Sequence, residues 1–277
     1  MPPFKYPGPI CQTKDWYDDI EDGTLVRTLS PLPSSVGSAA PQGAAKPPRR
    51  VVAKGACSFL NPQSRDTVVA PAEAFERLRK RSGATKISPP VQKAEQSWLD
   101  KSKSAAIVEE VQIDNQKIVV IRPTENEVKG KNLPTTKQVV EALRAVPAGQ
   151  RAWTNEVIIS PVKDPKSPDS AADAGDGGVT FFPMDKAQSQ NNFDNRLMHE
   201  SGHNYQGSLW KQTGAGPWET AAKADDRRPS PYAARDYGED FCEFIVLYNT
   251  AKGTSCEAVA KQIYPNRWKK MKEYQSP

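Results

Sequence analysis

The sequence predicts an α+β fold, in which helices flank a small mixed sheet and a proline-rich arm precedes the whole. Helical periodicity occupies both ends of the chain beyond residue 50, whereas alternating apolar residues occupy its middle. Residues 30–50 are rich in Pro, Ser and Ala and offer little to bury, as in a flexible tether. We therefore expect a flexible arm over residues 1–50, a helical region over 51–104 and an α+β domain over 105–277.

The first elements follow from apolar periodicity and from the residues that end it. Gly83 is a natural stop for a helix that begins near residue 70. The alternating stretch 106–123 carries a polar break, which predicts a β-hairpin. In order, we expect helices over 70–83 and 90–104, the hairpin over 106–123, a helix over 135–147 and a strand over 154–162.

The second half of the chain is expected to carry the function. Residues 163–178 read as a loop, and its length makes it a candidate functional loop. A short strand over 178–184 follows, closed by Pro183. The next helix can be capped by Asn191, Asn192 or Asp194. An apolar helix over 236–253 and closing helices interrupted at Pro265 complete the chain.

Composition narrows the functional classes. The net charge is +5, and the basic clusters 77–81 and 267–272 are short, so we interpret them as solvated helix faces and expect no nucleic-acid partner. No apolar run is as long as a membrane span. The N-terminus has no apolar region of a secretory signal peptide. A protein of this kind stays in the cytoplasm or is exported without a cleaved leader.

The four cysteines do not settle the redox state. Cys11, Cys57, Cys242 and Cys256 form no Cys-x-x-Cys pair, which argues against a cysteine-rich zinc site. They could all be reduced and buried, as in a cytoplasmic protein. An even number also permits two disulfides, and a bond between Cys242 and Cys256 could link neighbouring helices.

The strongest functional signal is His199-Glu200-Ser201-Gly202-His203, which contains both histidines of the chain. Residues four apart on a helix share a face, so His199 and His203 can bind one ion. Glu200 can then reach a water whose pKa zinc lowers. The alternative is a polar helix face with two solvated histidines. We expect one zinc ion per chain.

A third ligand must be Asp or Glu, because no third histidine exists. Glu239 and Glu243 lie four apart at the start of an apolar helix, where burying two carboxylates is costly unless something compensates. We expect Glu239 to bind zinc and Glu243 to accept a hydrogen bond from a zinc-binding histidine. The other acidic candidates are Glu219, Asp225, Asp226, Asp236 and Asp240.

"HESGH" followed by "YAARDYGEDFCEF" resembles the lethal-factor type of zinc metallopeptidase, which includes the secreted Pro-Pro endopeptidases. The resemblance covers about residues 105–275 and implies a zincin-like fold with a glutamate ligand downstream of the His-Glu-x-x-His helix. Tyr232, seven residues before Glu239, matches a tyrosine that stabilises the oxyanion, with Tyr205 and Tyr237 as rivals. The resemblance also implies a substrate-binding edge strand formed by Gly178, Val179, Thr180 and Phe181.

These observations favour a zinc-dependent hydrolase that cleaves a peptide bond, with Glu200 as general base. The type of chain indicates a bacterial effector or toxin that acts on a protein or peptide, and a secretion machine or an immunity protein could be a further partner. One alternative is a peptidoglycan amidase or endopeptidase with the same zinc chemistry. The other is a non-enzymatic adaptor with a structural zinc, although such sites normally have four protein ligands.

Overall fold

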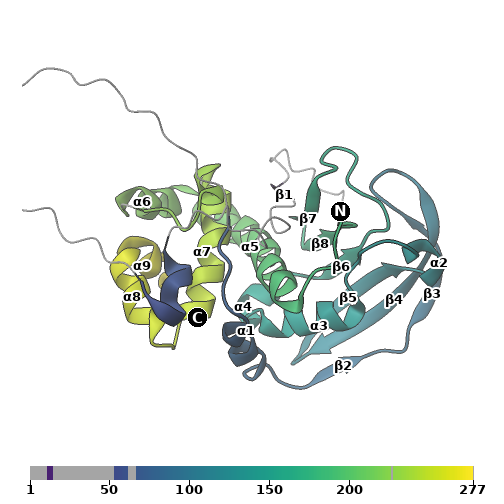
Figure 1. The fold of residues 1–277 in the computed structure, drawn as a ribbon, viewed down its shortest axis with the longest axis horizontal. Coiled ribbons are helices and arrows are strands. Elements are labelled where there is room, and N and C mark those ends of the chain that lie inside the picture. Colours follow the sequence, from purple (N-terminus) through teal and green to yellow (C-terminus); the bar gives the residue numbers. More distant parts are fainter. Residues whose placement is uncertain (1–10, 15–52, 62–66, 226, 277) are drawn as a thin grey trace, which may run out of the picture.

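The computed structural model describes residues 11–14, 53–61, 67–225 and 227–276. It confirms the α+β class, with a mixed sheet in the middle of the sequence and helices on both sides of it. Helix α5 (Gln190–Thr213) lies between the sheet and the C-terminal helices (Figure 1). Among the described helices, none is long and apolar enough to cross a membrane.

The sheet is larger than expected, with eight strands among the described residues. Its order is β1-β7-β8-β6-β5-β4-β2, and β3 also pairs with β4. The β5–β6 and β6–β8 pairs are parallel, and the other pairs are antiparallel. The strands are β1 (Cys11–Lys14), β2 (Thr85–Ile87), β3 (Val91–Ser97), β4 (Lys103–Ile113), β5 (Gln116–Pro123), β6 (Glu156–Ile159), β7 (Ser170–Gly175) and β8 (Gly178–Phe181).

The expected hairpin over 106–123 is confirmed as β4 and β5, but the helix expected over 90–104 is wrong. Val91–Ser97 is instead strand β3, antiparallel to β4. Its side chains are mostly exposed, so no apolar stripe holds it as a helix against the body. Backbone pairing with β4 decides its conformation, which overrides the modest helix propensity of its Gln, Lys, Ala and Glu residues.

The loop expected over 163–178 contains strand β7. Asp176 and Gly177 both have positive φ, at 50° and 82°, and they form the two-residue turn between β7 and β8. Strand β8 pairs with β6 on one side and β7 on the other. The expectation that residues 178–181 form an edge strand is therefore wrong, because both their edges are hydrogen-bonded. Strand β1 from the expected arm covers the outer edge of β7, and the arm's other residues lie outside the described ranges.

Most of the expected helices are confirmed. Helix α5 begins at Gln190, and its cap is the Ser189 hydroxyl, which accepts from the Asn192 amide, rather than any of the three residues proposed from the sequence. The confirmed helices are α1 (Ala72–Arg79), α3 (Thr136–Ala145), α7 (Tyr237–Ala251), α8 (Cys256–Ile263) and α9 (Pro265–Tyr274). The remaining short elements are η1 (Gly55–Leu60), α2 (Glu125–Val128), α4 (Ala148–Arg151), α6 (Gly216–Ala224) and η2 (Tyr232–Ala234).

One large apolar core joins the sheet to α5 and α7. Val157, Val179 and Phe181 are buried on the face of the sheet that meets α5. Phe193 of α5 packs against Phe181, with their ring centroids 4.4 Å apart. This packing fixes the position of α5 against the sheet, and Phe244 belongs to the same core on α7.

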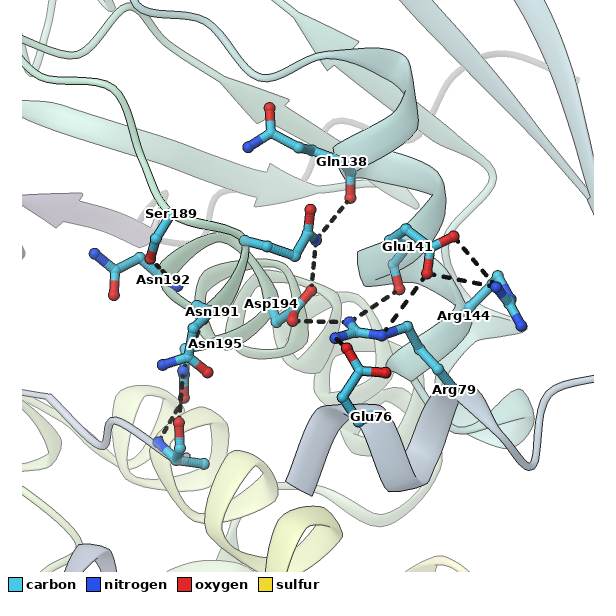
Figure 2. Close-up of polar contacts among 12 residues, drawn as sticks. Glu76, Arg79, Gln138, Glu141, Arg144, Ser189, Asn191, Asn192, Asp194 and Asn195 are labelled. Atoms are coloured by element: carbon cyan, nitrogen blue, oxygen red, sulfur yellow. Dashed lines mark hydrogen bonds and ion pairs between the residues drawn. The ribbon is translucent and has the colours of Figure 1, made fainter. Parts of the chain in front are cut away.

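Each of the basic clusters 77–81 and 267–272 contains an arginine that is buried rather than solvated. Arg79 donates to Asp194 near the start of α5 at 2.8 Å (Figure 2). Arg267 donates two hydrogen bonds to Asp240 of α7 and contacts Asp225 at 3.3 Å. The interpretation of these clusters as solvated faces is therefore wrong for Arg79 and Arg267, which anchor α5 and α7 through buried ion pairs.

Cys57 of η1 and Cys256 of α8 form a disulfide. The pairing of Cys242 with Cys256 is therefore wrong, and Cys242 is a buried free thiol on α7. The disulfide joins residues separated by 199 positions in sequence, so it ties the beginning of the described body to its C-terminal helices.

The disulfide should contribute measurably to stability. Replacing Cys57 and Cys256 together by serine should lower the free energy of unfolding by about 2 to 5 kcal/mol, because the unfolded chain loses a constraint across a long loop. Denaturant unfolding followed by circular dichroism measures this difference. A reductant should destabilise the parent chain and leave the double variant unchanged. An equal effect on both proteins would contradict the assignment.

Candidate metal centre

His199 and His203 project from one face of α5 into the contact between α5 and α7. Their side chains are only 4% and 8% exposed, which excludes the alternative of two solvated histidines. Together with Cys242 they form a buried group that could hold a metal ion, with ligand atoms within 4.8 Å of one another. Their placement follows from helical geometry, because residues four apart lie one turn apart on the same face.

Glu239 of α7 completes a tighter triangle. The two histidine Nε2 atoms are 3.2 Å apart. Oε2 of Glu239 lies 3.1 Å from Nε2 of His199 and 3.5 Å from Nε2 of His203. Tetrahedral zinc binds such atoms at about 2.1 Å, which places any two ligand atoms about 3.4 Å apart. The triangle therefore has the dimensions of three zinc ligands around one ion.

The other nitrogen of each histidine is held by α5 and α7. Nδ1 of His199 lies 2.9 Å from Oε1 of Glu243. Nδ1 of His203 lies 3.0 Å from the Cys242 sulfur and 3.1 Å from Oε1 of Gln206. Such contacts fix the ring orientation and leave Nε2 to face an ion.

Sequence reasoning placed Glu243 at this outer position but missed Cys242 and Gln206. A signal for Gln206 exists, because it follows His203 by three positions and so shares its face of α5. Cys242 likewise follows Glu239 by three positions and so shares its face of α7. Burial, and then the charges of Glu239 and other carboxylates, raise the pKa of the Cys242 thiol well above its usual value. A thiol in this environment stays protonated in the absence of a metal.

The candidate centre gathers buried carboxylates and imidazoles whose pKa values shift one another. Burial disfavours protonation of His199, but hydrogen bonds with Glu239 and Glu243 outweigh it and raise the pKa of this histidine well above its usual value. Burial raises the pKa of Glu239, whereas the two histidines lower it. The net shift of this pKa is downward. Two buried carboxylates thus contact two imidazoles, and a divalent ion would compensate the negative charge.

The other acidic candidates have different partners. Asp225 accepts from the backbone of Asn266 and Arg267, and Asp240 accepts from Arg267. Asp236 caps α7 by accepting from the amides of Gly238 and Glu239. Glu219 pairs with Lys223 on α6, and Asp226 lies outside the described residues.

Tyr232 is the tyrosine nearest to the centre among the three candidates from the sequence. It is buried in η2, and its ring centroid lies 5.9 Å from that of His199. The Tyr205 hydroxyl donates to the carbonyl of Tyr274 at 2.7 Å. The Tyr237 ring contacts the ammonium of Lys223, 5.3 Å from the ring centroid.

Glu200 is fully buried on α5, and its charge reaches strand β7. Burial, and then repulsion by Glu200, raise the pKa of Asp173 in β7 to about 7. Sequence reasoning missed Asp173 because it lay in a segment expected to be a loop. This effect on Asp173 indicates that Glu200 is on the side of the centre that faces the sheet.

Gly202 permits the contact between α5 and α7. A Cβ at this position would lie 3.0 Å from Cγ2 of Ile245 and 3.3 Å from the Cys242 sulfur. Both distances are shorter than ordinary van der Waals contacts, so a larger residue here would force Ile245 and Cys242 of α7 to shift by a few tenths of an ångström. The glycine inside the His-Glu-x-x-His stretch therefore has a packing role.

No protein-family model, curated protein sequence or solved structure matches this chain.

Replacing Gly202 with alanine should separate Glu239 from the histidines. We expect Gly202→Ala to lower the free energy of unfolding by about 1 to 3 kcal/mol and zinc affinity by about tenfold or more, because overpacking displaces α7. Gly207→Ala is the matched control on the same helix, since its Cβ would meet no atom within 4 Å. The control should be neutral or gain up to about 1 kcal/mol from helix propensity. Equal zinc affinity in both variants, measured by competition with a chelating dye, would contradict the packing role.

Proposed function

We propose that the chain is a zinc-dependent hydrolase that cleaves a peptide bond, with His199, His203 and Glu239 as zinc ligands. The observation that carries this proposal is the triangle of Nε2, Nε2 and Oε2 atoms, with sides of 3.1, 3.2 and 3.5 Å. A site with three protein ligands leaves a position open, which is the arrangement of catalytic zinc. The resemblance to the lethal-factor type of metallopeptidase supports the same ligand set.

Glu239 fits better than Cys242 as the third ligand. Its Oε2 contacts the same nitrogen, Nε2, on both histidines. The Cys242 sulfur instead contacts Nδ1 of His203, on the opposite side of that ring from the triangle. Coordination by Cys242 together with the two Nε2 atoms would require its side chain to leave this contact. We therefore assign Cys242 to the support of His203, as Glu243 supports His199.

The residues around the triangle have complementary tasks in hydrolysis. Zinc, when bound, supplies a Lewis acid for the scissile carbonyl and acidifies water. Glu200 accepts the proton of the attacking water and passes it to the amine as the carbon–nitrogen bond breaks. Tyr232, beside His199, donates a hydrogen bond to the oxygen that becomes negative. The products are a carboxylic acid and an amine, which at neutral pH are a carboxylate and an ammonium ion, and Glu200 returns to its starting state.

The target of this chemistry is either a protein or a peptidoglycan stem peptide, and the site would serve both. We propose the role of a bacterial effector or toxin from the type of chain. Digestion of purified peptidoglycan and of a peptide library by the same protein separates the two targets.

One observation favours a second candidate, a non-enzymatic adaptor with a structural zinc. Cys242 lies in the group with the two histidines, and with Glu239 it would provide the four protein ligands of a closed site.

The two ligand sets predict different effects of substitution on zinc binding. Glu239→Gln should weaken zinc binding more than about 100-fold, beyond the loss typical of outer residues, because it removes a charged ligand. Cys242→Ser should retain zinc within about tenfold, since a hydroxyl can still contact His203. Metal analysis of protein purified without a polyhistidine tag measures both. A sulfur-to-metal charge-transfer band after cobalt substitution, lost in Cys242→Ser, would instead favour the closed site.

Glu200→Gln should separate catalysis from metal binding. The variant keeps the shape of the side chain but cannot accept a proton at neutral pH, so peptide hydrolysis should fall by at least about 100-fold. Zinc content should equal that of the parent, because Glu200 is outside the triangle. If the parent chain is toxic to cells, the variant should be harmless at equal expression. Toxicity that persists would mean that binding causes the damage, as expected of an adaptor.

A further inference from the structure

The outer edge of β7 accepts an added strand. β7 is hydrogen-bonded to β8 on its inner side, and the described strand on its other side is the four-residue β1. β1 runs antiparallel to β7, with Cys11, Gln12 and Thr13 opposite Ala174, Asp173 and Ala172. An edge of this kind offers backbone groups to any extended segment, and a segment of the same chain fills it here.

This edge is fixed next to the metal centre. Asn204, the residue after His203, accepts from the Gly177 amide at 3.2 Å and donates to the Gly178 carbonyl at 3.0 Å. Both glycines belong to the turn and strand that follow β7, so α5 holds this hairpin by its end. The charges of Glu200 and His203 act on Asp173 in the middle of β7. A peptide on the edge would therefore run beside the two histidines.

Asp173 gives this edge a chemical preference. Its Oδ1 atom is buried and has no hydrogen-bond partner. Burying a carboxylate oxygen without a partner is costly, and a cation is the group that relieves the cost. In an antiparallel pair, directly opposite residues lie on the same face of the sheet with their Cβ atoms about 5 Å apart. Gln12 holds the position opposite Asp173 in β1, and its amide cannot supply a positive charge.

We propose that the β7 edge is a binding site for an extended basic peptide, with a lysine or arginine opposite Asp173, and that residues 11–14 occupy it as an internal ligand. Because the residue opposite Asp173 in the internal strand is neutral, a peptide with a basic residue at that position can replace this strand. Binding of a peptide at this edge does not depend on hydrolytic activity. If the proposed function holds, this edge is where the substrate lies, and the N-terminal segment competes with it.

Synthetic peptides and full-length variants test both halves of the proposal. In the chain, Gln12→Pro and Thr13→Pro together remove amide donors from β1 and should free the edge. The probe is a fluorescent peptide with the sequence of residues 8–17 carrying Cys11→Ser, measured by anisotropy. It should bind the double variant at least about tenfold more tightly than the parent, because a tethered segment competes at about millimolar effective concentration. Equal binding to both proteins would overturn the occupancy of the edge.

The preference for a cation is measured with a second peptide, identical except for Gln12→Lys. It should bind the double variant up to about fivefold more tightly than the first, the range expected for an opposite-charge pair across strands. Asp173→Asn should abolish this preference while the first peptide still binds, whereas Asp176→Asn in the neighbouring turn should preserve it. A preference that survives Asp173→Asn would overturn the assigned role of Asp173.

A disulfide cross-link tests the occupancy of the edge in a chain that does not carry the two proline substitutions. Ala174→Cys places a thiol opposite the native Cys11, and oxidation should link the two, as read by mass spectrometry. Asp176→Cys, beyond the end of β7, should not link to Cys11. Absence of the first link would overturn the occupancy. These measurements detect binding and cross-linking rather than hydrolysis, and they need no zinc, so a failure of the hydrolytic proposal leaves them intact.

Discussion

The close contact between α5 and α7 is the constraint on which the site depends. Three candidate ligand atoms from two helices meet within 3.5 Å, and this requires side chains of one helix to reach the surface of the other. Gly202 makes that approach possible, because a Cβ there would lie 3.0 Å from Ile245. A small residue one position before His203 thus sets the distance between the histidines and Glu239.

Buried ion pairs with other helices also hold these two helices in place. Asp194 near the start of α5 pairs with Arg79, so α1 holds the helix that carries both histidines (Figure 2). Asp240, the residue after Glu239, pairs with Arg267 of α9. Buried pairs of this kind cost desolvation, but removing one partner would leave a buried charge and disturb the helix.

The candidate metal centre is connected directly to the sheet. Asn204 joins α5 to the β7–β8 hairpin directly after His203, and the charge of Glu200 reaches Asp173 on β7. The proposed catalytic base therefore acts electrostatically on the strand at the edge of the sheet. A peptide held there by backbone hydrogen bonds would present its carbonyl groups to the centre. The same arrangement would serve a protein target or a stem peptide.

The sequence alone determined what depends on local geometry. Four-residue spacing on a helix places His199 with His203, and the same spacing placed Glu239 with Glu243. Only the tertiary structure decided the non-local pairings. β7 and β1 lie outside β8 in the sheet, β3 is a strand, and Cys256 is bonded to Cys57 across 199 positions. Such pairings depend on segments far apart in the chain, and the periodicity of a single segment carries no information about its partner. For the same reason, the contact of Cys242 with Nδ1 of His203 became visible only once α7 was packed against α5.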